Sequence, residues 1–120
     1  MPLPEDVRLR ALFLLLAFCQ LRVPATLQRT YRLSVRIRMN AVTLYECYGP
    51  WQPRFPKSSR TPVAQFRYDL AEEKWTLYWS DYDWRWHHYD RAEPTPDIAR
   101  LIAEVHEDPM GLFFSEKPQR

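Results

Sequence analysis

Glycine is almost absent from this chain, whose 120 residues include only Gly49 and Gly111. Loops that cradle phosphate groups need several closely spaced glycines, and the sequence contains no such loop. No serine or cysteine stands in a recognisable nucleophile elbow. The common nucleotide-binding and serine-hydrolase frameworks therefore do not apply.

Cysteine and lysine are also scarce. Cys19 and Cys47 are far apart and form no C-x-x-C pair, so we expect reduced thiols, no disulfide framework, no metal and no cofactor. Among the 17 basic residues only Lys57, Lys74 and Lys117 are lysine. The excess of arginine fits either a coding bias or a need for planar, bidentate contacts with carboxylate or phosphate.

No apolar run reaches the roughly 20 residues that span a bilayer. The longest, residues 11–18, follows Glu5 and Asp6 and lacks both a basic leader and a small-residue cleavage site, which argues against a signal peptide. We expect it to form a buried helix in a cytoplasmic protein without membrane attachment. Length and composition predict a single domain over residues 1–120.

Local signals predict a helix at each end of the chain and five strands between them. A proline and two acids at residues 4–6 begin a helix that runs to about Arg22. Residues 94–97 begin a second helix, which Pro109 ends. Alternation predicts strands over residues 30–38, 42–48, 63–69, 74–80 and 84–90. The predicted fold class is α+β, a five-stranded antiparallel meander sheet with both helices packed on it.

Three segments fall outside these elements. Prolines recur through residues 49–62, which predicts an exposed loop that is long enough to be functional. Residues 110–114 form a short apolar tail that we expect to dock on the core. Residues 115–120 are expected to be flexible.

Alternation also divides the strands into two faces. One face is apolar, and we expect its tryptophans, Trp75, Trp79, Trp84 and Trp86, to anchor a core beneath the first helix. The second face mixes arginine with tyrosine and histidine. Its predicted ligand-binding members are Arg32, Arg36, Tyr45, Arg67, Tyr78, Arg85, His87 and Tyr89.

The second face permits three interpretations. Tyr78 and His87 could form a stacking platform for bases while arginines engage phosphates. Alternatively, the second helix covers this face and the aromatic residues pack beneath it. A homodimer interface is the third interpretation, because such interfaces are enriched in tyrosine, tryptophan and arginine. Our leading hypothesis is a non-enzymatic binding module for single-stranded nucleic acid, RNA in the first place; a protein-interaction subunit is an alternative.

Glu46 is out of place, because alternation puts its carboxylate on the apolar face. It either reaches water at the strand end, or it is a buried acid that is paired or poised for catalysis. Glu46 and His87 as acid and base, with Arg67 stabilising an anion, would make a small hydrolase or nuclease. Alternation assigns Glu46 and His87 to opposite faces, which argues against this alternative without excluding an enzyme.

Several other polar residues have plainer explanations. His87 and His88 cannot both bind one metal ion unless a bulge intervenes, because neighbouring strand residues point to opposite faces. Asp81 and Asp83 flank a turn and are expected to cap it, with paired catalytic acids as the alternative. Asp108 is expected to end the second helix.

A set of ordered motifs resembles a known family. VTLYE (residues 42–46), Trp51, PVAQFRY (62–68), WTLYW (75–79), WHHY (86–89) and DPMGLFF (108–114) occur in this order. The chain thereby resembles the small bacterial domain-of-unknown-function family numbered 3024, over nearly its full length. The resemblance implies a free-standing bacterial cytoplasmic protein. It does not indicate a reaction, because that family has no assigned activity. The motif positions it marks are Glu46, Trp51, Arg67, Tyr78, Trp86, His87, Tyr89 and Asp108.

Overall fold

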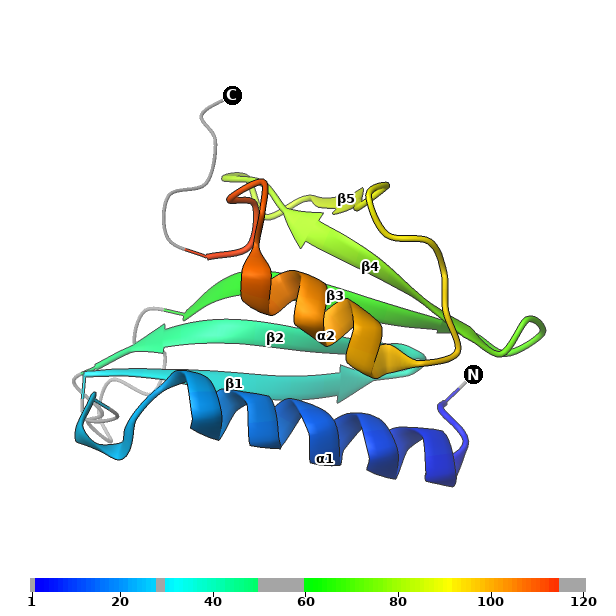
Figure 1. The fold of residues 1–120 in the computed structure, drawn as a ribbon, viewed down its shortest axis with the longest axis horizontal. Coiled ribbons are helices and arrows are strands. Elements are labelled where there is room, and N and C mark those ends of the chain that lie inside the picture. Colours follow the sequence, from blue (N-terminus) through cyan, green and yellow to red (C-terminus); the bar gives the residue numbers. More distant parts are fainter. Residues whose placement is uncertain (1, 28–29, 50–59, 115–120) are drawn as a thin grey trace.

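The computed structural model describes residues 2–27, 30–49 and 60–114. Its strands form one antiparallel sheet in the order β1-β2-β3-β4-β5, with a helix before and after them (Figure 1). The predicted α+β class and five-stranded meander are confirmed. The elements are α1 Glu5–Arg22, the 3-10 helix η1 Ala25–Leu27, β1 Tyr31–Arg38, β2 Ala41–Tyr48, β3 Arg60–Asp69, β4 Lys74–Ser80, β5 Trp86–His88 and α2 Ile98–Glu107.

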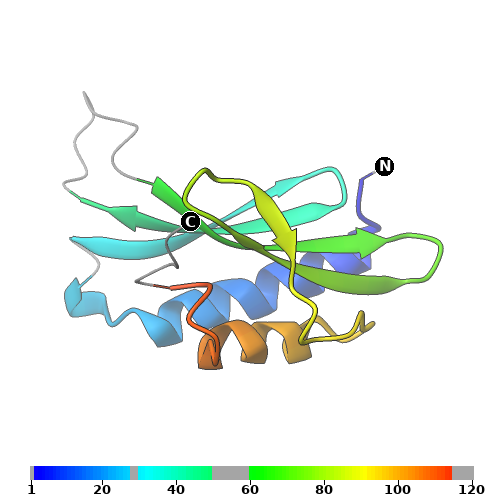
Figure 2. The ribbon, with the colours of Figure 1, turned by 90° about the horizontal axis from the view of Figure 1, so that it is seen from above.

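The two helices lie side by side on the same face of the sheet. Figure 2 shows both beneath the strands, and α1 contacts β1 and α2 while α2 contacts β4. The alternative in which the second helix covers the arginine-rich face is therefore wrong. The chain builds a two-layer arrangement, and one face of the sheet carries neither helix.

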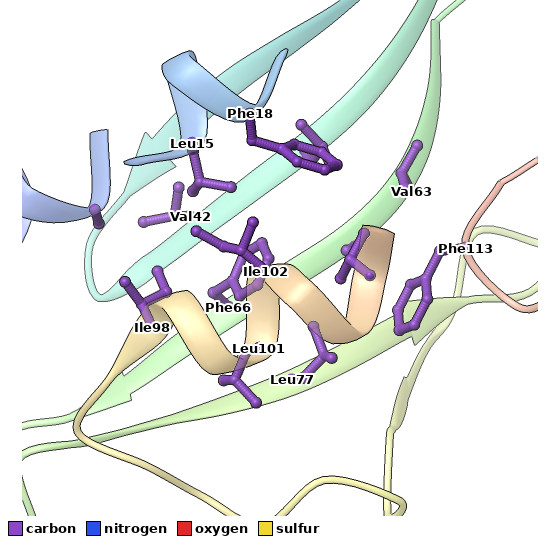
Figure 3. Packing of buried hydrophobic residues seen from close by; sticks show 14 of the residues in the cluster. Leu15, Phe18, Val42, Val63, Phe66, Leu77, Ile98, Leu101, Ile102 and Phe113 are labelled. Atoms are coloured by element: carbon purple, nitrogen blue, oxygen red, sulfur yellow. The ribbon is translucent and has the colours of Figure 1, made fainter. Parts of the chain in front are cut away.

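A single apolar core fills the space between the helices and the sheet (Figure 3). Leu15 and Phe18 of α1 meet Ile102 of α2 above Phe66 and Leu77, which lie on adjacent strands. Burial of each such side chain stabilises the fold by roughly 1.5–3 kcal/mol before entropy is counted. The apolar alternation of the strands therefore faces the helices, as predicted.

The outer surface of α1 departs from the expected broad burial. Leu9, Phe13 and Leu16 are 51%, 72% and 51% exposed. Their spacing puts them on one side of the helix. The helix is apolar around most of its circumference, but the sheet and α2 cover only part of it.

The second helix has clear boundaries. The Asp97 carboxylate accepts a hydrogen bond from the backbone N–H of Ala99 (3.2 Å) at the N-cap. Its apolar residues recur with helical spacing, so that one face is buried and the other is in water. At its end Asp108 adopts a left-handed conformation.

A β-bulge interrupts the pairing of β2 with β3. Leu44 pairs with Ala64 but Tyr45 pairs with Pro62, which leaves Val63 as the additional residue. Proline has no N–H to donate and is tolerated in sheets at bulges and edges. Because β3 already includes Arg60, three residues of the predicted loop 49–62 belong to a strand; residues 50–59 lie outside the described residues.

The last strand is shorter and differently placed than predicted. β5 comprises Trp86–His88 rather than residues 84–90, because the preceding turn takes up Trp84 at φ 63°. Trp84 is 61% exposed, and Trp86 pairs with Ser80 on the face away from the helices. The prediction that Trp84 and Trp86 anchor the core is wrong, whereas Trp75 is buried and Trp79 packs against the core.

The β1–β2 turn contains a similar left-handed residue. Met39 has a φ of 56° and is 54% exposed. Asparagine tolerates this conformation better than methionine does, but it is not Asn40 that adopts it. Instead, the Asn40 side-chain amide donates to the carbonyl of Tyr68 (2.8 Å), which ties the turn to β3.

Candidate nucleic-acid interface

One continuous row of side chains crosses the face of the sheet that has no helix. Strand pairing places Arg36, Thr43, Gln65, Tyr78 and His88 opposite one another from β1 to β5. Residues directly opposite in antiparallel strands share one face. We call this surface the helix-free face; by the same pairing it comprises Arg32, Ser34, Arg36, Arg38, Ala41, Thr43, Tyr45, Cys47, Arg60, Pro62, Gln65, Arg67, Asp69, Lys74, Thr76, Tyr78, Ser80, Trp86 and His88.

Hydrogen bonds and ring contacts connect most of this row. Gln65 donates from Nε2 to Thr43 Oγ1 (2.9 Å), and Arg67 Nε donates to Gln65 Oε1 (2.6 Å). The Arg67 guanidinium lies 3.8 Å from the centre of the Tyr78 ring, and the Tyr78 and His88 rings meet edge to face at 5.7 Å. The network orients Arg67 and Tyr78, so both side chains have a defined position on this face.

Three arginines of this face have no acidic partner in the part of the chain that the structure describes. Within the described residues, no carboxylate lies within 4.0 Å of the guanidinium of Arg36, Arg38 or Arg67. Arg36 and Arg38 are exposed and Arg67 is half-buried. Three arginines on one side of a sheet create a positive potential that attracts anions.

The aromatic partner of Tyr78 is His88 and not His87. The register pairs Tyr78 with His88 and Trp79 with His87, so His87 points toward the side of the sheet that carries the helices. The predicted Tyr78–His87 pair is therefore wrong by one residue. A one-residue shift moves every side chain of a strand to the other face.

His87 instead closes the β4–β5 turn. Its Nε2 lies 2.7 Å from Oδ2 of Asp81, and its ring stacks on Trp79 at 4.6 Å. Oδ1 of Asp81 accepts from the backbone N–H groups of Asp83 (2.8 Å) and Arg85 (3.0 Å). The bond with His87 is the main cause that lowers the pKa of Asp81 to about 2. Capping by Asp81, as expected from the sequence, is confirmed.

Tyr89 is a core residue. It is 1% exposed, it donates from its hydroxyl to Glu104 Oε2 on α2 (2.6 Å), and its ring meets Phe113 at 5.1 Å. Burial, followed by the bond to Glu104, raises the pKa of Tyr89 to about 12. Its predicted position on the ligand-binding face is wrong.

Glu46 is a buried and paired carboxylate. It lies opposite Leu33 on the helix side and is 5% exposed, so it does not reach water at the strand end. Tyr31 donates to its Oε2 at 2.7 Å and Tyr48 at 3.4 Å. Burial and this bond raise the pKa of Tyr31, so the phenol is a donor at neutral pH. The pair holds the ends of β1 and β2 together.

The three residues of the hydrolase hypothesis do not converge. The prediction that Glu46 and His87 lie on opposite faces is wrong, because both are on the helix side. Strands β3 and β4 nevertheless separate Glu46 on β2 from His87 on β5. Arg67 lies on the other face of the sheet from both. The described geometry therefore offers no acid–base pair at these positions.

The remaining predicted binding residues divide between the sheet and its surroundings. Arg32 lies at the Cys47 end of the helix-free face, and the Tyr45 ring lies 4.8 Å from the guanidinium of Arg60. Arg85 is exposed in the β4–β5 turn. The sequence missed Trp86 and His88 as members of the face, and only the correct register of β5 would have revealed them.

The apolar tail is docked by Asp108. Its two carboxylate oxygens accept hydrogen bonds from the backbone N–H groups of Leu112 (2.8 Å), Phe113 (3.1 Å) and Phe114 (3.0 Å). Gly111 provides the left-handed residue (φ 66°) that this loop requires. Phe113 and Phe114 are buried, so the expected docking is confirmed.

Other parts of the described structure give weaker indications of a binding site. A groove of about 640 Å³ beside α2 is lined by equal numbers of basic and acidic side chains, among them Arg91, Arg100, Glu93 and Glu107. It has no charge preference that would select a ligand. Among the described residues, no three His, Cys, Asp or Glu side chains are grouped to hold a metal ion, and no helix has the length and apolar character to cross a membrane.

Comparison with known proteins identifies the family. A family model described as Domain of unknown function (DUF3024) matches residues 3–115. The chain belongs to this family. No curated protein and no solved structure shows significant similarity to it.

The motif positions of this DUF3024 chain serve different purposes in the structure. Glu46, Tyr89 and Asp108 tie strands, helix and tail together through short hydrogen bonds. Arg67 and Tyr78 lie on the helix-free face. Trp51 lies outside the described residues. In this chain the polar groups with structural roles are thus separate from those on the helix-free face.

Proposed function

We propose that this protein is a cytoplasmic, non-enzymatic binding module that holds single-stranded nucleic acid on the helix-free face. The observation that supports it is that Arg36, Arg38 and Arg67 have no carboxylate partner among the described residues, and that Arg67 lies over Tyr78. The resemblance to small bacterial proteins suggests a bacterial cytoplasm as its place of action.

The chemistry of the face suits a polyanion with planar bases. Arg36 and Arg38 are exposed and can form bidentate contacts with phosphate oxygens. The Arg67 guanidinium, which lies over the Tyr78 ring and is positioned by it, and the His88 ring would offer flat surfaces on which unpaired bases stack. The row crosses five strands, which gives a length of about 19 Å at the usual strand spacing.

RNA is the preferred ligand in this proposal. A sheet face that offers stacking surfaces recognises splayed-out bases, which single strands expose and duplexes hide. Ser34 and Gln65 are half-buried neutral groups between the arginines. Hydroxyl and amide groups at such positions can bond to a ribose 2′-hydroxyl, the group that distinguishes RNA from DNA.

Fluorescence anisotropy with an oligouridylate of about 12 nucleotides tests the proposal, since single-strand-binding folds have sites of this size. Arg36→Gln and Arg67→Gln should each weaken binding and lower the steepness of its salt dependence by about 0.7 in log–log slope. Arg100→Gln on α2 is the matched control, because it removes the same charge from an exposed position on the helix side.

Thermal melting of each variant verifies the fold before its affinity is compared. Absence of binding by the wild type at low salt would overturn the proposal. An Arg100→Gln loss equal to that of Arg36→Gln would also overturn it, because binding would then depend on net charge alone.

The outer surface of α1 favours a second candidate function, self-association. Leu9, Phe13 and Leu16 form an exposed apolar strip on a helix about 27 Å long. A second copy of the chain offers the same strip, and a two-fold axis lets the strip pack on itself. Light scattering should give a dimer for the wild type and a monomer for Phe13→Asp; a monomeric wild type would remove this candidate.

A further inference from the structure

The β4–β5 turn holds a tryptophan in an unfavourable conformation at the surface. Trp84 has a φ of 63° and is 61% exposed. A left-handed conformation crowds the Cβ of any residue except glycine, and exposure of an indole adds nothing to the core. Glycine at this position would therefore give a more stable fold than tryptophan does.

The turn is held in place around this residue. The Trp84 N–H donates to the Asp81 carbonyl (3.0 Å), and the Asp81 N–H donates to the Arg85 carbonyl (3.0 Å). The Asp81 side chain adds the bonds to Asp83, Arg85 and His87 described above. Strain that the surrounding structure enforces is characteristic of ligand-binding positions.

The turn also stands beside the helix-free face. Figure 2 shows the chain between β4 and β5 rising from the sheet on the side away from both helices. Trp86, which follows the turn, is a member of that face, and Arg85 beside it is exposed. The turn therefore lies at the end of β4, directly after the Ser80–Trp86 pair, which is two residues along the strands from the Tyr78–His88 pair of the row.

We propose that Trp84 is the terminal stacking residue of the binding site and takes one unpaired base beyond Tyr78 and His88. This inference rests on the proposed function, and it assigns a base-binding role to a residue outside the sheet. The indole face accepts any base, because stacking needs no hydrogen-bond pattern. Arg85, which is exposed in the same turn, would contact the phosphate of that nucleotide.

Met39 provides a matched control for the test. It is also a large apolar side chain at positive φ in a hairpin turn, and it is 54% exposed, but it lies in the β1–β2 turn. Trp84→Gly and Met39→Gly both relieve a left-handed residue. Each should raise Tm by about 2 °C.

Only one of these substitutions should affect binding. Trp84→Gly should weaken the affinity for the oligouridylate by about 5- to 30-fold, as removal of a base-stacking ring does. Met39→Gly should leave the affinity unchanged. Trp84→Phe should keep it within about 3-fold, because a smaller ring still stacks.

The outcomes separate this inference from the proposed function. If the wild type binds and Arg67→Gln weakens binding while Trp84→Gly does not, only the role of Trp84 is overturned. If the wild type does not bind, both fall. If Trp84→Gly lowers Tm, Trp84→Leu replaces it, since leucine keeps an apolar side chain without a ring; unchanged affinity in that variant overturns the stacking role.

Discussion

The two faces of the sheet treat their polar groups in opposite ways. On the helix side, Glu46 and Glu104 each accept a short hydrogen bond from a tyrosine. On the helix-free face, Arg36 and Arg38 have no carboxylate within ion-pair distance among the described residues. Burial enforces pairing, because an unpaired buried charge is costly. Groups that remain unpaired can be used for a ligand.

The sharpest way to break this comparison is a matched pair of truncations. Phe66→Ala removes a fully buried ring from the helix side and should cost about 3–5 kcal/mol of unfolding free energy. Arg36→Ala should stay within about 0.5 kcal/mol of the wild type, because its side chain is exposed. Denaturant unfolding measures both, and a similar cost for the two would contradict the division of the faces.

Loss of a donor to the buried acid should have the next largest effect. Tyr31→Phe deprives Glu46 of its shorter hydrogen bond, and we expect a loss of about 1–3 kcal/mol. Thermal melting detects this change. Tyr45→Phe on the opposite face is the control and should be nearly neutral; equal losses would show that the Glu46 bond has no special weight.

Alkaline pH should remove the Tyr89–Glu104 hydrogen bond only above the pH at which an ordinary tyrosine ionises. The phenol donates only while it is protonated, and its pKa is raised from 10.0 to about 12. The bond therefore stabilises the fold fully below about pH 10, and this stability is lost as pH rises through about 12.

The difference in unfolding free energy between the wild type and Tyr89→Phe follows this change. We expect about 1–2 kcal/mol at neutral pH, declining only in strongly alkaline solution. A difference that is already gone at pH 9 would contradict the assignment of the Tyr89 bond.

The smallest effect concerns the rates of thiol modification rather than stability. Burial raises the pKa of Cys19 to about 11, so its reactive thiolate is scarce at neutral pH. Cys47 lies on the helix-free face and is only half-buried, with Sγ 3.3 Å from the Ser34 hydroxyl. A colorimetric thiol reagent should modify Cys47 first. Cys19→Ala and Cys47→Ala variants assign the phases, and a fast Cys19 would contradict the burial of α1.

Sequence patterns predicted the first four strands well because their apolar alternation is long and consistent. In β1, apolar residues from Tyr31 to Ile37 recur at every second position, and the structure buries this side against the helices. A pattern of this length leaves one register that hides the apolar side chains. The Asp97 cap and the spacing of α2 were equally clear.

The register of β5 could not be obtained in this way. The strand has only three residues, and tryptophan, histidine and tyrosine alternate ambiguously around it. The turn before it is longer than predicted because Asp81 binds the backbone of Asp83 and Arg85 and Trp84 becomes left-handed. The left-handed conformation of Trp84 sets the register of β5. This register determines that His88, and not His87, lies on the helix-free face.

The partial exposure of α1 could not be predicted from the sequence either. Leu9, Phe13 and Leu16 are as apolar as the buried Leu15. Periodicity cannot divide a helix that is apolar on every side. Only the placement of α2 beside α1, on the same face of the sheet, determines which leucines are covered.

The order of the strands makes β1 and β5 the two edges of the sheet. An edge strand is a template to which another chain can add a strand, which leads to aggregation. β1 carries Arg32, Arg36 and Arg38 at alternate positions, and β5 ends after three residues. The arginines proposed for phosphate contact would thus also keep the protein soluble, and variants that neutralise all three should be purified at low concentration to avoid fibrous precipitates.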